Sequence, residues 1–263
     1  MSAREKSKSV PSGSLIPYET ESRDTRHTVH TTSLVYNVTV SIRDNWLAFR
    51  DRLAEAANTY GRDPSKIAVM AVSKTRGTEE ILEASSCGLS LFGENRIEEA
   101  CDKFFTSEKF SLYLIGHLQS RKVRKIDSRF AGVHSVDSLR LARKLSRRAG
   151  ENGKTLEILL QVNTSGEETK FGFDDYSSFV DTAAEISRLP FLNLRGLMTM
   201  APFTNSESVV RGCFSKCRRW SEDITGMIEG EVVLSMGMSA DFQWAVAESS
   251  NLLRIGSAIF GGR

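Results

Sequence analysis

The sequence predicts an α/β protein that folds as one (β/α)8 TIM barrel with an extra helix at its amino-terminal side. Short apolar or β-branched runs alternate with amphipathic stretches, a pattern typical of repeated βα units around a parallel sheet. Eight such runs can be counted, the number that closes this barrel. The units together take up about 225 residues, close to the roughly 250 that the architecture usually needs.

The extra helix comes first. Trp46, Phe49, Leu53 and Ala57 recur at helical spacing, and Gly61 follows as a typical stop. The predicted strands are residues 67–72, 89–92, 112–115, 132–136, 156–162, 194–200, 232–235 and 252–260. Helices are predicted between them, among others at 78–87, 96–105, 138–152 and 178–189. A doubly wound open sheet is the alternative, since a strand count made from sequence is uncertain by one or two.

Residues 1–34 differ from the rest of the chain in composition. They are rich in Ser, Thr and charged residues and have no sustained apolar period, which predicts a flexible extension. Residues 35–263 are expected to form the barrel. Because the barrel uses up this length, no second domain is expected beside it.

The composition argues against several classes of function. A net charge of +2 gives no general attraction to nucleic acid or to an anionic membrane. No run approaches the roughly 18 apolar residues of a membrane helix, and no secretory signal opens the chain, so a cytoplasmic location is expected. Cys213 and Cys217 lie one helical turn apart, but a zinc site needs about four ligands, and no metal is expected.

The residues that follow the predicted strands carry the chemistry, because active sites of such barrels lie at the carboxyl ends of the strands. The first strand, in "KIAVMAVSKTRG", ends at Lys74. Two small turns follow the seventh and eighth strands, where backbone N–H groups and hydroxyls of such barrels commonly hold a phosphate. The residues of those turns that suit an anion are Ser235, Gly237, Ser239, Gly256 and Ser257.

An amine opposite a phosphate cradle favours pyridoxal 5′-phosphate (PLP) as the cofactor. PLP needs an amine for a Schiff base, a phosphate anchor and a group that faces its pyridine nitrogen. Lys74 would supply the amine, and Arg254 would face the nitrogen and keep it unprotonated. Each feature alone is commonplace, since a strand-end lysine is more often solvated, but three of them meet at one barrel mouth. His117 and His134 are expected to make supporting hydrogen bonds rather than to catalyse a reaction.

A series of motifs resembles the pyridoxal phosphate homeostasis protein family, which is related to the N-terminal domain of bacterial alanine racemase. The resemblance runs in order from about residue 36 to residue 263 without large gaps. The motifs that carry it are "AVSKT", "FGEN", "LIGHLQS", "HSVDS", "LQVNTSGEETKFGF", "LRGLMTMAPF", "LSMGMSADF" and "LRIGSAIFGGR".

The resemblance implies an alanine racemase N-terminal-domain-like barrel that holds PLP on Lys74. It also implies that Arg254 faces the pyridine ring and that Asn95 and Met198 line the pocket. The implied phosphate contacts are Ser235, Met236, Gly237, Ser239, Gly256 and Ser257. Members of the family are thought to buffer or carry PLP in vitamin B6 homeostasis and amino-acid balance. PLP-dependent apoenzymes are then the expected acceptors, and we expect the protein to be a monomer.

An amino-acid racemase of the alanine racemase type is the rival hypothesis. Two-base racemisation needs a second acid–base group on the other face of the cofactor, which racemases take from an added β domain. This chain ends at Arg263, directly after the last predicted strand, so a carrier without racemase activity is expected. Arg76 stands where relatives often have lysine, which leaves Lys170 as the alternative second amine for handing the cofactor on.

Overall fold

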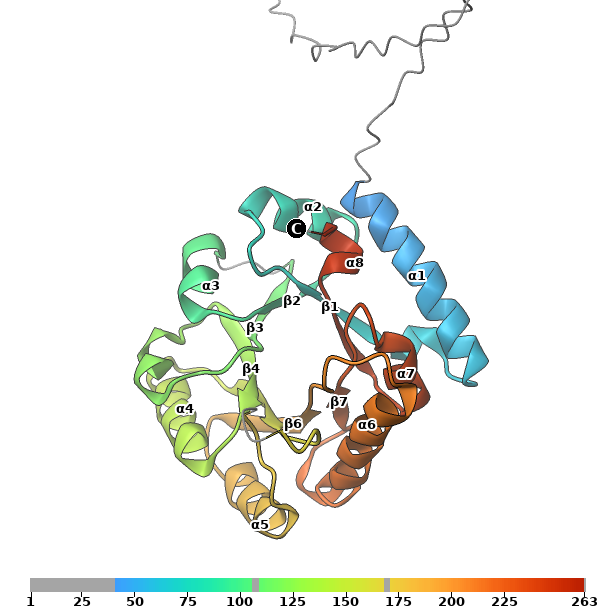
Figure 1. Ribbon diagram of the computed structural model, residues 1–263. Coiled ribbons are helices and arrows are strands. Elements are labelled where there is room, and N and C mark those ends of the chain that lie inside the picture. Colours follow the sequence, from blue (N-terminus) through green and yellow to red (C-terminus); the bar gives the residue numbers. More distant parts are fainter. Residues whose placement is uncertain (1–40, 106–108, 168–170, 263) are drawn as a thin grey trace, which may run out of the picture. The chain divides into compact units, whose positions relative to one another are not determined.

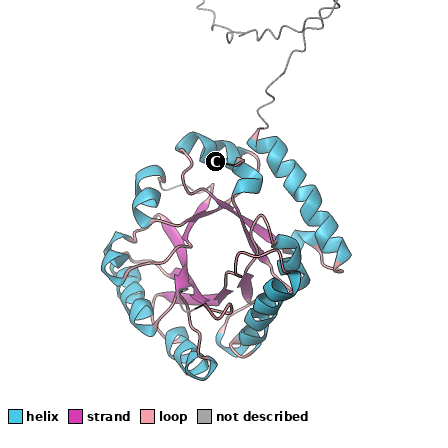
Figure 2. Ribbon diagram, in the orientation of Figure 1, coloured by secondary structure: helices cyan, strands magenta, loops and turns pink. Residues whose placement is uncertain are grey.

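The protein forms a closed barrel of eight parallel strands in a computed structural model that describes residues 41–105, 109–167 and 171–262. The strands pair in chain order, and the last pairs with the first, as Figures 1 and 2 show. They are β1 (Ala68–Val72), β2 (Leu91–Glu94), β3 (Ser111–Leu114), β4 (Phe130–Val136), β5 (Leu156–Gln161), β6 (Leu192–Met198), β7 (Val233–Ser235) and β8 (Leu252–Ile255). The predicted (β/α)8 barrel is confirmed, and the open sheet is wrong.

Helices surround the barrel on its outer side (Figure 2). The α-helices are α1 (Ile42–Thr59), α2 (Thr78–Ser86), α3 (Ile97–Lys103), α4 (Leu139–Glu151), α5 (Tyr176–Ser187), α6 (Glu207–Glu222), α7 (Phe242–Ala247) and α8 (Ser257–Phe260). Three 3-10 helices complete the described connections: η1 (Pro64–Lys66), η2 (Ser120–Lys125) and η3 (Thr225–Met227). None of the described helices is long and apolar enough to cross a membrane.

The extra helix α1 lies beside α7 and α8 (Figure 1). Ser41 caps its first turn, because the Ser41 hydroxyl accepts a hydrogen bond of 3.1 Å from the N–H of Asp44. Phe49 is buried on the inner face of α1 and meets the ring of Phe242 edge-on, with centroids 5.0 Å apart. The expected flexible extension, residues 1–34, lies outside the described residues.

The last predicted strand, 252–260, is partly wrong. β8 ends at Ile255, and the chain then turns into the short helix α8, because the N–H groups of Ile259 and Phe260 donate back to the carbonyl of Gly256. Ile259 and Phe260 are buried. An apolar run that is buried in a helix looks the same in sequence as one buried in a strand, which explains the error.

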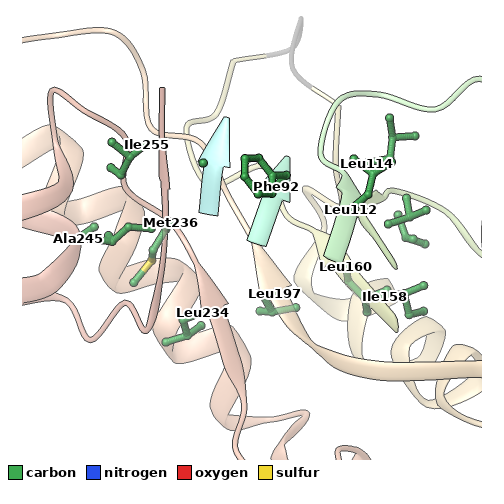
Figure 3. Packing of buried hydrophobic residues seen from close by; sticks show 14 of the residues in the cluster. Phe92, Leu112, Leu114, Ile158, Leu160, Leu197, Leu234, Met236, Ala245 and Ile255 are labelled. Atoms are coloured by element: carbon green, nitrogen blue, oxygen red, sulfur yellow. The ribbon is translucent and has the colours of Figure 1, made fainter. Parts of the chain in front are cut away.

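Apolar side chains form two separate clusters. The larger one lies between the strands and the surrounding helices, and Figure 3 shows part of it, including Phe92, Leu112 and Leu197. The smaller one consists of alternate residues of β1, of β3 and the position after it, and of β8: Met70, Val72, Tyr113, Ile115 and Leu252. We call this second cluster the barrel plug. Because side chains alternate along a strand, the two clusters face opposite sides of the barrel wall.

Candidate cofactor-binding site

A cavity of about 740 Å³ opens at the carboxyl ends of the strands, and we call it the carboxyl-end cavity. It is lined by residues from the loops after β1, β2, β3, β5, β6, β7 and β8, although these loops are far apart in the sequence. Of the ten residues predicted to bind a cofactor, six line it: Lys74, Asn95, Ser239, Arg254, Gly256 and Ser257. The structure therefore brings the predicted amine, the arginine and part of the small-residue turns to one cavity.

Lys74 lies on a tight turn whose backbone forms hydrogen bonds with charged side chains of α3. Thr75, the next residue, has a φ of 64°, a left-handed conformation that is uncommon for a β-branched residue. The backbone N–H of Thr75 donates to the carboxylate of Glu99. The ammonium of Lys103 donates to the carbonyl of Ser73 at 2.6 Å and to that of Arg76 at 3.2 Å. The turn is thus fixed on both sides of Lys74.

Glu94 connects the same turn to the barrel. Its Oε1 lies 2.8 Å from Nζ of Lys103 and accepts a 2.6 Å hydrogen bond from the hydroxyl of Ser73. Glu94 is fully buried, and this desolvation raises the pKa of its carboxyl above the ordinary value, while Lys103 and Ser73 oppose the rise. Oε2 of Glu94 makes no hydrogen bond with any described residue. Buried Glu94 and the partly buried Glu99 and Lys103 thus form a charged network that supports the turn of Lys74.

Arg254 is buried in β8, with 4% of its surface exposed. Its NH1 donates to the carbonyl of Ser235 at 2.6 Å and to the Ser235 hydroxyl at 2.9 Å, and its NH2 donates to the carbonyl of Thr199 at 2.8 Å. No carboxylate of the described chain lies within ion-pair distance of the guanidinium. Burial lowers the pKa of Arg254 to about 10, which leaves the side chain charged at neutral pH.

The two turns predicted to hold a phosphate lie side by side. The hydroxyl of Ser239, in the first turn, accepts a 3.3 Å hydrogen bond from the N–H of Ala258, which follows Ser257 in the second. The carbonyl of Gly237 accepts a 3.0 Å hydrogen bond from the N–H of Arg254. The turns and the arginine are therefore fixed relative to one another.

Four of the predicted residues lie behind the cavity wall instead of lining it. Ser235 is buried and accepts a hydrogen bond from Arg254, and Met198, at the end of β6, is its register partner. Met236 belongs to the larger apolar cluster. Gly237 has a φ of 95°, and a Cβ there would lie only 2.5 Å from Cβ of Ala245. Ser235 and the carbonyl of Gly237 thus bind Arg254, whereas Met198 and Met236 are buried apolar residues.

Several residues of the site carried no clear signal in the sequence. The contact between Lys103 and Ser73 joins positions thirty apart in the chain, and Thr199 takes part only through its backbone carbonyl. Glu94 could have been noticed, because a carboxylate at the end of an apolar strand must find a partner when buried. The alternative second amine, Lys170, lies outside the described residues.

His117 also lines the carboxyl-end cavity. Its Nδ1 lies 3.2 Å from a carboxylate oxygen of Asp137, and its ring stacks on Phe171 with centroids 3.6 Å apart. His117 therefore has a carboxylate beside its ring, while its predicted supporting hydrogen bond stays a prediction. His134 lies elsewhere: it is buried, does not line this cavity, and its Nδ1 has no hydrogen-bond partner among the described residues.

Exposed apolar side chains line the same cavity. They are Phe171, Met200, Phe203 and Met238, and we call them the apolar rim. Their exposed fractions run from 37% for Met200 to 103% for Phe203. A group of exposed apolar side chains around a cavity is typical of a surface that meets another molecule.

Comparison with known proteins places this barrel in a defined class. The family described as alanine racemase, N-terminal domain, matches residues 43–263. The chain therefore has the barrel of that class.

The relatives narrow the class further. The pyridoxal phosphate homeostasis protein of Vibrio cholerae is 38% identical over 230 residues, which cover 85% of this chain and 97% of the relative. PipY of Synechococcus elongatus is similar in its structure without PLP, with 32% identity, a TM-score of 0.75, and coverage of 84% of this chain and 100% of PipY. Its structure with PLP bound gives 33% identity, a TM-score of 0.67, and coverage of 80% and 100%. The chain belongs to the pyridoxal phosphate homeostasis protein family.

Proposed function

We propose that this protein binds PLP through Lys74 and holds it in an exchangeable form, as a carrier or buffer in intracellular PLP homeostasis. The observation that carries the proposal is the meeting of Lys74, Arg254 and the Ser239 and Ser257 turns around one cavity of about 740 Å³. The cofactor named for the relatives, PLP, needs an amine, an anion cradle and a group for its ring nitrogen.

The residues present fit such a cofactor. Arg254 is a buried cation without a carboxylate partner in the described chain, so the cavity beside it favours an anionic or electron-rich group. The Ser239 and Ser257 hydroxyls and the backbone of Gly256 suit a phosphate, because no bulky side chain stands at these positions. Lys74 has no hydrogen bond to a described residue, so its amine is available for a bond to the cofactor.

Each residue has a defined part in binding. The amine of Lys74 condenses with the aldehyde carbon of PLP, which forms a C=N bond and releases one water molecule. Bound PLP can stabilise carbanions as an electron sink. Arg254 weakens this ability, because a guanidinium that keeps its own protons cannot give one to the pyridine nitrogen. Asn95 lines the same cavity and can donate or accept a hydrogen bond at the ring substituents.

A carrier must transfer PLP to an acceptor protein, and the apolar rim supports this transfer. The rim residues lie at the cavity that would hold PLP, so a protein docked on them would face the cofactor directly. We propose that PLP-dependent apoenzymes are the acceptors and that the protein works as a monomer in the cytoplasm, with no catalytic turnover of its own.

Racemisation is the alternative that one observation favours. His117 lies at the cavity and is held by Asp137, so it is a candidate for the second proton-transfer group that a racemase needs. Under our proposal His117 instead packs against Phe171 and shields the cavity mouth. The two functions differ in whether L-alanine is converted into D-alanine.

The proposal is tested by titrating the purified protein with PLP and recording the visible absorbance of the C=N bond. We expect the band in the wild type and in the control Lys144→Ala, and its loss in Lys74→Ala. The same sample is then given L-alanine, and we expect no D-alanine above background. A band that persists in Lys74→Ala would contradict the assigned amine. Turnover at roughly 1 to 10³ per second, as in ordinary enzymes, that disappears in His117→Asn would establish a racemase instead.

A further inference from the structure

A second cavity, of about 260 Å³, lies at the opposite end of the barrel, and we call it the amino-end cavity. Each of the eight strands contributes at least one lining residue. The barrel plug separates the two cavities: Met70, Tyr113 and Leu252 line the amino-end cavity, whereas Val72 and Ile115 line the carboxyl-end cavity. Packed barrels usually fill this space with side chains, so an open cavity here needs an explanation.

The wall of the amino-end cavity is divided into a polar and an apolar half. Four consecutive strands, β3 to β6, contribute the polar side chains that come from strands, namely Tyr113, His134, Glu157 and Arg195, beside the apolar Leu159. Lys66, Glu231 and Asn251, which precede β1, β7 and β8, add polar groups at the edge of the cavity. The strands on the other side, β7, β8, β1 and β2, contribute Val233, Leu252, Met70 and Leu91. An amphipathic wall of this kind fits a small molecule with charged groups on one side and an apolar body on the other.

Glu157 and Arg195, the two charged side chains of the polar half, form no ion pair with each other. Glu157 accepts a 2.9 Å hydrogen bond from the Tyr113 hydroxyl and forms no ion pair within the described chain. Arg195 donates from NH1 to the carbonyl of Glu229 at 3.2 Å, and no described carboxylate lies within ion-pair distance of its guanidinium. A carboxylate and a guanidinium therefore both face the cavity with bonding capacity left over.

His134 adds a second sign that the polar half is incomplete. It is 4% exposed and lines the cavity, and its Nδ1 has no hydrogen-bond partner among the described residues. A buried nitrogen without a partner is uncommon in proteins and points to a missing polar group. The mouth of the cavity is open to solvent, because Lys66 and Glu231 at its edge are exposed.

We propose that the amino-end cavity binds an aliphatic α-amino acid. Arg195 would bind its carboxylate, Glu157 would bind its ammonium, and the aliphatic side chain would pack on Met70, Leu252 and Val233. The volume agrees with a small ligand, since it lies just below the roughly 300 Å³ of the smallest ligand pockets and far above the space of one water. The proposal does not depend on PLP binding, which concerns the other end of the barrel.

The test is isothermal titration of the full chain, freed of PLP so that no aldehyde can react with an amino group. L-Leucine is the probe, and 4-methylpentanoate and isopentylamine are its analogues without the ammonium and without the carboxylate. We expect L-leucine to bind with a dissociation constant of about 1 mM or lower. Each analogue should bind at least about tenfold more weakly, because one charge-assisted contact is missing.

Two variants locate the binding. Glu157→Gln keeps the volume and an oxygen for the Tyr113 hydroxyl but removes the charge, and Arg195→Gln removes the guanidinium. Both should weaken L-leucine binding at least about tenfold, while Arg218→Gln, on α6 away from the cavity, should not change it. Melting temperatures confirm that each variant is folded. No binding of L-leucine up to about 10 mM, or equal binding by the wild type and both cavity variants, would overturn the proposal.

Discussion

Nζ of Lys103 lies 2.6 Å from the carbonyl oxygen of Ser73, the residue that precedes Lys74. This contact ties α3 to the turn after β1, and Glu94 completes it from β2. Two side chains that the cofactor would not touch therefore hold the backbone from which the amine projects. The position of Lys74 depends on this network, because Lys74 itself makes no hydrogen bond with a described residue.

Variants of Lys103 should show whether this network only stabilises the fold or also positions Lys74 for PLP binding. Lys103→Met leaves the buried carboxylate of Glu94 without its cation and should lower the free energy of unfolding by about 3 kcal/mol. Lys103→Met combined with Glu94→Gln removes the buried charge and should recover much of that loss. In both variants residue 103 no longer binds the backbone of the turn, so PLP affinity should remain about tenfold lower than in the wild type.

The measurements are urea unfolding and PLP titration, with Lys144→Met on α4 as the control. A double variant that binds PLP as tightly as the wild type would show that Lys103 serves stability alone and does not position Lys74.

Gly237 should tolerate no side chain. Its φ is 95°, and a Cβ would lie 2.5 Å from Cβ of Ala245 and 2.8 Å from Cδ2 of Leu253. We expect Gly237→Ala to lower the free energy of unfolding by about 2 kcal/mol. Gly212→Ala is the matched control, because a Cβ at that position in α6 meets nothing within 4 Å and should stabilise the helix by roughly 0.5 kcal/mol. Equal melting temperatures for the two variants would contradict the geometry.

His134 should make the stability of the protein depend on pH. Burial lowers its pKa to about 3, with the charge of Arg254 adding to the effect. An unfolded histidine binds a proton below about pH 6.5, whereas buried His134 stays neutral, so its contribution to stability is lost as the pH falls from about 6.5 towards 3. Between pH 7.5 and 5.0 this loss is about 2 kcal/mol.

Urea unfolding of the wild type and His134→Gln across this pH range checks the effect. The glutamine variant should lose less stability than the wild type on acidification, by about 2 kcal/mol. Parallel curves for the two proteins would mean that His134 takes up a proton as easily in the folded as in the unfolded chain.

The apolar rim should matter for transfer of PLP and not for its binding. Phe203 is 103% exposed, so Phe203→Ser should leave folding and PLP affinity unchanged. Transfer of PLP to an aminotransferase freed of its cofactor should slow several-fold, because docking on the rim loses an aromatic contact. Leu47→Ser, at an exposed apolar position on α1, is the control. The rim has no part in transfer if Phe203→Ser and Leu47→Ser deliver PLP at the same rate.

The sequence was sufficient for the barrel and for the main candidates of the site. Lys74 and Arg254 could be predicted because strand ends in a parallel barrel converge at one face, whatever their distance along the chain. The end of β8 was mispredicted, since the apolar pattern of residues 257–260 suits a buried helix as well as a strand.

Other features depend on side-chain placement that no periodicity shows. Lys103 reaches Ser73 only because α3 packs beside the turn after β1, and nothing in the sequence pairs these positions. The amino-end cavity exists because residues of eight strands leave a space between them. Its polar half, from Tyr113 to Arg195, becomes visible only when strands β3 to β6 are placed side by side.

The most direct test of the proposed function is chemical and identifies the residue that holds PLP. The PLP-loaded protein is reduced with borohydride, which converts the C=N bond into a stable C–N bond, and is then digested and analysed by mass spectrometry. We expect one phosphopyridoxyl group on the peptide that contains Lys74. A group on another lysine, or no modified peptide from a fully loaded sample, would contradict it.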